Sequence, residues 1–406
     1  MWRSFELIEF AVVHFRSFKF LSMNTVVDKT DSVVIFSFDY PPHDGGISRL
    51  CAAIAHQIAS DSHHLLTLTE DAKISDGPQS PTPKVIRVTT LRPLRELAAL
   101  WKLLTLPRNA LIVSGIWYPE GLLALLARRR RTVILAHGLE LRSSASRFKR
   151  WLRARLLTAV CRSARVVVTN SEYTGRLVAA AVPEARVVAI PLGVDHLRFT
   201  PDRDLTVRDA YAPAECFLIG TVARLHSYKG HDVILNAIAA LPGSLRAQIR
   251  YLIAGVGPYR AAIERCIADL GLDQQVRFLG YVKEEELPRL YRAMDLFVMC
   301  TREHTDTPEV EGFGLVFLEA QACGTPVVGT RTGGIPDAIR HGEGGWLIEQ
   351  DDVAALTSIL SRLISDRCAL RAAGIAARRR VEHECTWEIY YGRFLAGLAE
   401  NGLAIG

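Results

Sequence analysis

Cysteine is scarce in this sequence, with 8 among 406 residues, and no two of them form a CxxC pair. The absence of such pairs excludes a zinc knuckle and a thioredoxin-type redox motif. Most of the cysteines stand in apolar or helical contexts, as Cys161, Cys300 and Cys323 do. We therefore expect reduced, buried thiols in a cytoplasmic protein rather than a disulfide framework.

Long apolar runs are also absent. No stretch reaches the roughly 18–20 uninterrupted apolar residues that a membrane-spanning helix needs. Residues 1–24 are apolar and aromatic, but charged residues and a histidine interrupt them, which is untypical of a secretory signal. The segment is either an amphipathic surface helix or the product of a mis-assigned start, with translation beginning at Met23. We favour the second, because the first predicted strand begins only at Ser32.

Acidic residues are nearly missing from one basic segment, although the net charge of +6 is mild. Between Arg128 and Arg165 the only acidic residue is Glu140. The basic residues there are Arg128–Arg131, Arg142, Arg147, Lys149, Arg150, Arg153, Arg155, Arg162 and Arg165. Such an asymmetry indicates a polyanionic partner. We do not expect that partner to be nucleic acid, since no recognition motif accompanies the charge.

Short apolar runs alternate with helical patterns along the chain, which is typical of βαβ units and parallel sheets. The pattern occurs twice. The first set of predicted strands is Ser32–Phe38, Ala110–Ser114, Thr132–Ala136, Val166–Thr169 and Val187–Ile190. The second set is Phe217–Val222, Arg250–Ala254, Val276–Phe278, Leu296–Met299, Pro326–Gly329 and Gly345–Ile348. Continuous Val, Ile and Leu runs indicate strands covered by helices on both faces.

A linker richer in Pro, Asp and Arg, residues 196–215, separates the two sets. We predict an α/β protein of two doubly wound Rossmann-like domains that face a cleft. The predicted division is an extension over 1–30, domains over 31–195 and 216–385, and a final helix within 386–406 that crosses back to the first domain. Ligands of open α/β sheets bind outside the carboxyl ends of the strands. Two such edges at one cleft suit a donor–acceptor pair.

Glu311 and Glu319 enclose the sequence GFGLVFL. The spacing places Glu311 in a loop before a helix and Glu319 about two turns into that helix. The N–H groups at such a helix start form an anion site, and here they belong to Phe313, Gly314, Leu315 and Val316. A carboxylate at each end would accept hydrogen bonds from sugar hydroxyls. Paired glutamates are usually a solvated helix face, yet Glu319 lies inside an apolar run.

Arg224 and Lys229 follow the predicted strand Phe217–Val222. Side chains that leave the carboxyl end of this strand would enter the cleft. Two fixed cations are what a departing diphosphate requires, since they stabilise the negative charge that develops on it. An ordinary basic loop between a strand and a helix is the alternative interpretation.

Together these motifs resemble those of the retaining glycosyltransferases of the two-domain GT-B fold, glycosyltransferase family 4 (group 1), which includes bacterial mannosyltransferases. The family pattern of a glutamate, seven residues and a second glutamate matches Glu311 and Glu319. Its basic pair matches Arg224 and Lys229, although Val222-Ala223 stands where the family usually has a glycine. The resemblance extends from about Ser32 to Leu398 and is more specific in the C-terminal half.

The resemblance implies that each motif holds part of a nucleotide-sugar donor. Glu319 would hydrogen-bond the ribose, and Glu311 would contact the transferred sugar near its 3-hydroxyl. The backbone N–H groups of Gly312 to Val316 would hold sugar and phosphate.

The other C-terminal motifs would surround the rest of the donor. Arg224 and Lys229 would neutralise the diphosphate. Val282, in Gly280-Tyr281-Val282, matches the family's turn beside the nucleobase, which is read mainly through the backbone. Gly257 matches a glycine loop after the second strand of that domain, with a plain tight turn as the alternative.

The N-terminal half carries three looser matches. Gly46, in Asp44-Gly45-Gly46-Ile47-Ser48, would let the backbone approach the donor phosphate, although most glycine pairs are simply turns. His137, in Ala136-His137-Gly138, would touch the transferred sugar or orient groups at the reacting centre, although a lone histidine is more often structural. Gly193-Val194-Asp195 resembles the family's interdomain element, which we interpret as hinge and cleft wall.

Retention of anomeric configuration is implied by the resemblance, and so is activity without a metal and without a cofactor beyond the nucleotide sugar. The donor motifs supply Arg and Lys where metal-dependent transferases of another fold use an Asp-x-Asp motif. The resemblance also makes 31–195 the acceptor-side domain and 216–385 the nucleotide-sugar-binding domain.

A basic amphipathic helix is predicted over residues 146–165. Apolar residues recur there at helical spacing, and the residues expected on the membrane or acceptor side are Arg147, Lys149, Arg150, Trp151 and Arg153. Such a helix suits the anionic inner face of a membrane, where each basic residue adds about 1 kcal/mol. The alternative is a core helix with solvated arginines. We therefore predict peripheral contact with the inner face of the cytoplasmic membrane.

The polar stretch Thr301–Glu311 resembles that of mannosyltransferases acting on lipid-linked acceptors. We therefore predict GDP-mannose as the donor substrate, with a UDP-sugar as the alternative. We predict a retaining hexosyltransferase that acts on a lipid-linked or saccharide acceptor in glycolipid or polysaccharide synthesis. The alternatives are a nucleotide-sugar epimerase of the same fold, a UDP-sugar transferase with a soluble acceptor, and a non-catalytic binding protein. The last is disfavoured because both acidic and both basic positions are present.

Overall fold

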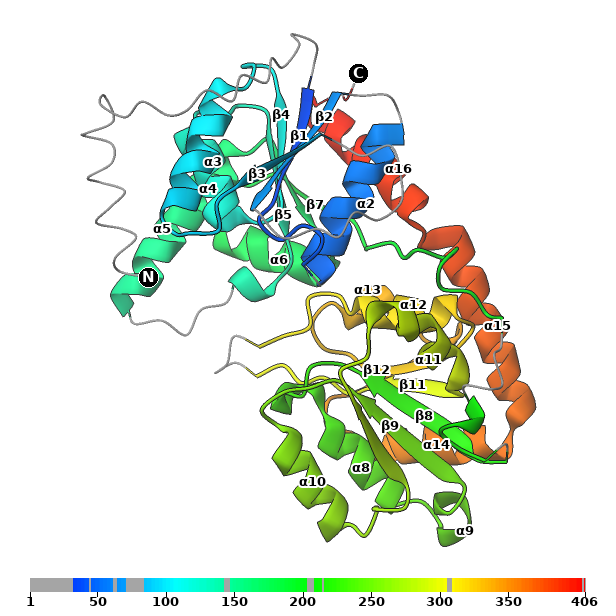
Figure 1. Cartoon of the computed structure of the whole chain (residues 1–406). Coiled ribbons are helices and arrows are strands. Elements are labelled where there is room, and N and C mark those ends of the chain that lie inside the picture. The colour runs from blue at the N-terminus through cyan, green and yellow to red at the C-terminus, as the bar shows by residue number, and fades with distance from the viewer. Residues whose placement is uncertain are drawn as a thin grey trace.

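The computed structural model describes residues 32–43, 45–60, 64–70, 84–141, 147–202, 208–213, 215–304, 309–403 and 405. The predicted extension over 1–30, Asp44 and part of the polar stretch before Glu311 lie outside these ranges. Figure 1 shows two lobes, each built around its own sheet and flanked by helices. This arrangement confirms the predicted fold class of two Rossmann-like domains.

The first lobe contains a seven-stranded parallel sheet in the order β3-β2-β1-β4-β5-β6-β7. Its strands are β1 (Ser32–Phe36), β2 (His64–Glu70), β3 (Lys84–Val88), β4 (Leu111–Ser114), β5 (Thr132–Ala136), β6 (Val166–Thr169) and β7 (Val187–Ala189). The prediction did not include β2 and β3. Both lack the continuous Val, Ile and Leu run of a central strand, and β3 forms the edge of the sheet.

Helices cover both faces of this sheet because β1 alternates its side chains between them. Val33 and Ile35 share a core with α2 (Gly46–Ser60) and the last helix, α16 (Trp387–Glu400). On the opposite face, Val34 and Phe36 pack with α3 (Leu94–Thr105) and α4 (Leu122–Leu126). The remaining elements are η1 (Trp117–Gly121), η2 (Leu139–Leu141), α5 (Arg147–Ser163) and α6 (Glu172–Ala181).

The second lobe contains a six-stranded parallel sheet in the order β10-β9-β8-β11-β12-β13. Its strands are β8 (Phe217–Val222), β9 (Ile249–Ala254), β10 (Val276–Gly280), β11 (Leu296–Met299), β12 (Val327–Thr330) and β13 (Gly345–Ile348). The predicted strands of this half all form, with bounds shifted by at most two residues.

Helices also flank the second sheet. They are α8 (His231–Ala239), α9 (Gly243–Arg246), α10 (Arg260–Asp269), α11 (Leu287–Ala293), α12 (Leu315–Ala322), α13 (Ile335–Ala338), α14 (Val353–Ser365) and α15 (Arg367–Glu384), with the short turns η3 (Ser227–Lys229) and η4 (Glu284–Glu286). Phe217 and Ile219 of β8 face α8, α10 and α14, whereas Leu218 faces α11 and α12. None of the helices in these described ranges is long and apolar enough to cross a membrane.

The chain passes between the lobes twice, and the two crossings touch. Val194 pairs with Thr386 in an isolated parallel bridge, and the Val194 N–H donates to the Cys385 carbonyl oxygen at 2.9 Å. A Cβ on Gly193 would lie 2.6 Å from the Thr386 carbonyl oxygen, so glycine is required at this approach. Beyond Thr386, α16 lies beside α2 of the first lobe (Figure 1).

The strand order places one switch point in each sheet. In the first sheet β1 lies between β2 and β4, and in the second β8 lies between β9 and β11. Crevices outside the carboxyl ends of strands at such points are where ligands of open α/β sheets bind. The loops after β1, β4, β8 and β11 therefore define where a site is expected.

Candidate functional site

Lys229 lies on the loop that follows β8, just before α8. The short turn η3 brings its side chain into a buried position, and Gly230 then enters the left-handed region with a φ of +71°. A Cβ on Gly230 would approach the Cys300 carbonyl oxygen to 1.8 Å, so this glycine lets the loop rest against the end of β11. Arg224, earlier on the same loop, is exposed.

Gly255 and Gly257 support the other side of this loop. A Cβ on Gly255 would lie 1.9 Å from the Ala223 carbonyl oxygen, and one on Gly257 would lie 2.3 Å from the Leu225 carbonyl oxygen. The Leu225 N–H also donates to the Val256 carbonyl oxygen at 3.0 Å. The loop after β9 thus fixes the backbone on either side of Arg224, which gives the predicted Gly257 a packing role.

Glu311 and Lys229 form an ion pair in which Nζ lies 2.6 Å from Oε2. Burial alone would lower the pKa of Lys229, but the carboxylate of Glu311 outweighs this effect and the pKa is raised. Nζ also lies 4.8 Å from the centre of the Tyr228 ring. Lys229 is therefore a cation beside Glu311 and Tyr228, and an N–H that neither of them engages can bind an anionic ligand.

Glu319 is buried in α12, with 1% of its surface exposed. The Tyr291 hydroxyl donates to its Oε2 at 2.7 Å, and the guanidinium of Arg49 pairs with its Oε1. Burial and the nearby Glu319 raise the pKa of Tyr291 well above its usual value. Glu319 therefore does not lie on a solvated helix face. It is buried within the apolar run, and Tyr291 and Arg49 bind its two carboxylate oxygens.

Arg49 comes from α2 of the first lobe and therefore links the two lobes at this point. Besides Glu319, it donates from Nε to Glu284 Oε1 at 2.9 Å. Burial would lower the pKa of Arg49, but the two carboxylates raise it. Sequence reasoning missed Arg49 and Tyr291. The sequence feature that could have indicated Arg49 is its position in the first turn of the helix that begins at Gly46.

The turn over 312–314 is enclosed by both lobes. A Cβ on Gly312 would lie 1.9 Å from the His137 carbonyl oxygen of the first lobe. Ser171 caps α6 and donates from Oγ to the Gly312 carbonyl oxygen at 2.7 Å. Gly314 has a φ of +88°, a left-handed conformation that favours glycine, and α12 begins at the next residue. The predicted N–H donors of Phe313, Gly314, Leu315 and Val316 thus stand at the boundary between the lobes.

His137 follows β5 and is held in one orientation. Its Nε2 lies 2.7 Å from the Gly115 carbonyl oxygen, and its backbone N–H donates to Glu140 Oε1 at 2.6 Å. Because a carbonyl oxygen can only accept, Nε2 carries the proton in this geometry and Nδ1 of the neutral ring is an acceptor. The histidine, Gly312 and the Lys229–Glu311 pair come from strand and helix ends that meet where the two lobes touch.

Gly46 and Val282, which were predicted to bind the donor, make fewer close contacts with the rest of the protein than the glycines described above. Gly46 is the first residue of α2, and a Cβ there would meet nothing within 4 Å. Val282 follows β10 and is partly buried against the core of the second lobe. No cluster of three His, Cys, Asp or Glu side chains with metal-binding geometry occurs among the residues that the structure describes.

The basic helix α5 does not join this group. Its N-terminal end, which begins at Arg147, exposes Phe148, Lys149, Arg150 and Trp151, and the Phe148 and Trp151 rings stack with centroids 6.0 Å apart. Arg153 points elsewhere, since it donates to the Glu140 carbonyl oxygen and lies 5.2 Å from the centre of the Trp117 ring. Burial lowers the pKa of Arg153. It anchors the helix to η1 rather than extending the exposed basic end.

Two family models match the chain in succession. The model of glycosyltransferase family 4 matches residues 44–198, and the model of glycosyl transferases group 1 matches residues 204–380. The two matches correspond to the two lobes, and the break between them falls between β7 and β8.

Relatives of known function match at the level of sequence. The chain is 30% identical over 371 residues to the GDP-mannose-dependent alpha-(1-6)-phosphatidylinositol monomannoside mannosyltransferase of Mycolicibacterium smegmatis, covering 87% of this chain and 95% of that protein. It is 36% identical over 231 residues to the D-inositol 3-phosphate glycosyltransferase of Salinispora arenicola, covering 53% of this chain and 49% of that protein.

Solved structures match at the level of fold. Anabaena HepE in complex with UDP superposes with a TM-score of 0.74 at 21% identity, covering 91% of this chain and 100% of that one. WaaG, a glycosyltransferase involved in lipopolysaccharide biosynthesis, superposes with a TM-score of 0.67 at 18% identity, covering 90% of this chain and 99% of that one.

Proposed function

Because the chain belongs to glycosyltransferase family 4, the group 1 glycosyltransferases, as its motifs predict, we propose that it transfers mannose from GDP-mannose to a lipid-linked acceptor. Transfer retains the anomeric configuration and needs no metal ion. The observation that carries the donor and the acceptor class is the match to the mycobacterial mannosyltransferase, which extends over 87% of this chain. The polar groups around Lys229 and Glu319 supply the chemistry.

The proposed reaction breaks the bond between the anomeric carbon and the diphosphate oxygen, and the electron pair leaves with GDP. The acceptor hydroxyl oxygen forms the new glycosidic bond and its proton is released. Negative charge grows on the diphosphate, where Arg224 and the remaining N–H donors of Lys229 stabilise it. The N–H groups at the start of α12 follow Glu311 closely in the chain and would favour an anion beside it.

The carboxylates and the histidine orient the donor in this proposal. Glu311 keeps Lys229 in place at 2.6 Å and accepts a hydroxyl of the transferred sugar. Glu319 accepts the ribose hydroxyls, for which Arg49 must yield part of its contact with that carboxylate. Nδ1 of His137 accepts a further sugar hydroxyl from the side of the first lobe, because Nε2 is engaged with Gly115.

Thermal stabilisation by a panel of GDP-, UDP-, ADP- and dTDP-sugars tests the donor. A ligand that binds only the folded state raises stability by RT ln(1 + [L]/Kd), so GDP-mannose is expected to give the largest shift. Incubation with labelled GDP-mannose and a phosphatidylinositol mannoside should then yield a labelled lipid. A shift with UDP-sugars alone would overturn the donor, and an isomerised nucleotide sugar formed without acceptor would indicate an epimerase instead.

The exposed end of α5 is proposed to contact an anionic membrane and bring the cleft to its lipid acceptor. Stacked Phe148 and Trp151 offer apolar surface, and Lys149 and Arg150 lie beside them. This combination is typical of helices that lie in the interface of a membrane. The acceptor-side lobe would then face the inner leaflet of the cytoplasmic membrane.

Sedimentation with vesicles of phosphatidylcholine and an anionic phospholipid tests this contact. Reversing both charges in Lys149→Glu with Arg150→Glu should lower the bound fraction strongly, since each basic residue contributes about 1 kcal/mol near such a surface. The control is Arg162→Glu at the other end of the same helix, whose side chain is 59% exposed. Unchanged sedimentation of the double variant would place the contact elsewhere on the protein.

A further inference from the structure

We propose that Arg302 is a positioning residue for the diphosphate-binding loop, holding Lys229 and the start of α8 in register with the ends of β11 and β13. The inference rests on the proposed function, because it concerns the same anionic site. Sequence reasoning gave Arg302 no role. The residue lies three positions after the end of β11, at the switch point of the second sheet.

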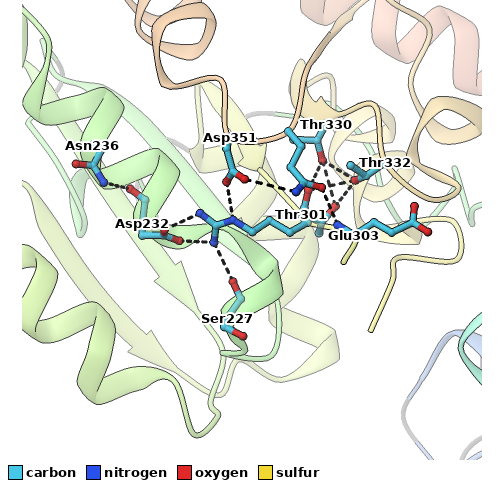
Figure 2. Close-up of polar contacts among 10 residues, drawn as sticks. Ser227, Asp232, Asn236, Thr301, Glu303, Thr330, Thr332 and Asp351 are labelled. Atoms are coloured by element: carbon cyan, nitrogen blue, oxygen red, sulfur yellow. Dashed lines mark hydrogen bonds and ion pairs between the residues drawn. The ribbon is translucent and has the colours of Figure 1, made fainter. Parts of the chain in front are cut away.

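The guanidinium of Arg302 joins three loops. Nη1 and Nη2 bind the two oxygens of Asp232 at 2.8 and 2.6 Å, in the first turn of α8. Nε binds Asp351 Oδ1 at 2.6 Å, after β13. Nη1 also donates to the Ser227 carbonyl oxygen at 3.2 Å, at the start of η3. Figure 2 shows that Ser227, Asp232 and Asp351 lie close together.

Lys229 lies between two of the points that Arg302 holds. Ser227 precedes it by two residues and Asp232 follows it by three, so the intervening turn has little freedom. The Arg302 backbone N–H adds a third contact by donating to the Tyr228 carbonyl oxygen at 2.6 Å. The side chain of Lys229 therefore leaves a backbone fixed before, beside and after it.

The segment that carries Arg302 is itself fixed to the sheet. Thr301 and Thr330 bind each other through their hydroxyls at 3.2 Å, and the Thr330 hydroxyl donates to the Thr301 carbonyl oxygen at 2.7 Å. Thr332 donates to the same carbonyl oxygen at 3.1 Å, and the three threonines lie together in Figure 2. Arg302 thus transmits the position of β11 and β12 to the loop of Lys229.

The two carboxylates around Arg302 require a positively charged side chain that can bind both of them. Asp232 and Asp351 are two carboxylates brought to one place, and the Arg302 side chain between them is only 14% exposed. Hydrogen bonding to Asp232 raises the pKa of Arg302, so the group stays charged. A lysine would keep the charge but has no planar fork, so it cannot reach Asp232 in a bidentate manner and Asp351 at the same time.

A double-mutant cycle tests the assignment. Arg302→Lys is combined with Arg224→Ala and Lys229→Ala, and mannosyl transfer and GDP affinity are measured for every combination. In the wild-type background Arg302→Lys should lower turnover on the order of ten- to a hundredfold, the scale of a misplaced catalytic group. In the background without Arg224 and Lys229 it should add less than about twofold, since neither cation remains to be positioned.

Arg331→Lys serves as the matched control. Arg331 also follows a strand of the second sheet, but its ion pair with Glu349 is largely exposed, and its replacement should leave turnover unchanged. A merely structural Arg302 would give the same fractional loss in both backgrounds, and that result would overturn the proposal. Normal turnover of Arg302→Lys would overturn it as well. Failure of the wild-type protein to bind GDP would instead remove the donor site, and the proposal with it.

Discussion

At the carboxyl edge of the second sheet, three carboxylates each meet a cation. Glu311 pairs with Lys229, Glu319 with Arg49, and Asp232 with Arg302. At the edge of the first sheet, by contrast, Glu120 is 2% exposed and its Oε1 accepts the Phe38 N–H at 3.1 Å. Its Oε2 has no hydrogen-bond partner among the described residues.

Where the lobes meet, the cation of the first lobe is Arg49, which binds Glu319. Around Gly312 the first lobe places hydrogen-bonding groups, namely the His137 carbonyl oxygen, the Ser171 hydroxyl and the His137 ring, whose Nε2 lies 2.7 Å from the Gly115 carbonyl oxygen. Buried ion pairs add little net stability compared with apolar packing. The three pairs at the edge of the second sheet, one of them made with Arg49 of the first lobe, therefore support the proposed binding of an anionic donor there.

The largest expected effect comes from removing the two cations of the second lobe that are proposed to bind the diphosphate. Arg224→Ala with Lys229→Ala should lower turnover by at least about a hundredfold, the scale for losing preorganised charge stabilisation. Steady-state transfer from GDP-mannose measures the effect. Arg260→Ala, an exposed arginine of α10 paired with Glu264, is the control. Near-normal turnover of the double variant would contradict the diphosphate role.

A smaller effect is expected where the two lobes meet. Gly312→Ala would place a Cβ 1.9 Å from the His137 carbonyl oxygen, so the lobes could not approach as they do here. Turnover should fall on the order of tenfold or more, because the acceptor side is displaced from the donor. Donor binding, for which most of the proposed contacts come from the second lobe, should fall less than turnover when measured by calorimetry.

Gly243→Ala is the control for this variant, because a Cβ on Gly243 meets nothing within 4 Å. Equal losses of donor affinity and turnover in Gly312→Ala would show that the substitution damages the second lobe itself. Such a result would contradict a specific role for the contact between the lobes.

Glu319 allows a further test of how the two lobes differ, because the cation that it binds, Arg49, belongs to the first lobe. Glu319→Gln keeps the size of the side chain but removes the charge, and nucleotide-sugar affinity should fall about tenfold, as for a lost hydrogen bond to a charged group. Calorimetry with GDP-mannose measures it. Glu284→Gln removes the other carboxylate that Arg49 binds and should have a smaller effect. Unchanged affinity in Glu319→Gln would contradict the ribose assignment.

Much of the fold follows from local pattern. Buried parallel strands are continuous apolar runs, so the central strands of both sheets are predictable, whereas β2 and β3 have mixed sequences at one side of the first sheet. Loops after strands and glycines before a helix likewise point to Lys229, Glu311 and the turn at Gly312. These residues owe their positions to the elements that they directly adjoin.

Partners that are distant in the sequence were beyond prediction. Arg49 binds a carboxylate 270 residues away, and Arg302 binds one 70 residues away. Which loops meet depends on strand order and on the approach of the lobes, neither of which a local pattern contains. Arg153 illustrates the same limit on a helix, because its direction depends on where Trp117 lies.

The last expected effect concerns stability rather than activity, at the unpaired carboxylate of the first lobe. Burial raises the pKa of Glu120 from 4.5 to about 7, although the hydrogen bond from Phe38 opposes the change. Between these values the folded protein retains a proton that the unfolded chain has lost, so stability falls as pH rises. The loss begins above about pH 4.5, is complete near pH 7 and amounts to roughly 3 kcal/mol at most.

Glu120→Gln should remove this dependence, because a neutral amide of similar shape cannot ionise and its oxygen can still accept the Phe38 N–H. Urea unfolding at pH 5 and pH 8 measures it: the variant should lose less stability between the two values than the wild type does. Glu285→Gln, at an exposed glutamate of η4, should retain the wild-type difference. An identical pH dependence in all three proteins would mean that Glu120 titrates normally, and the contrast between the two lobes would then not extend to this carboxylate.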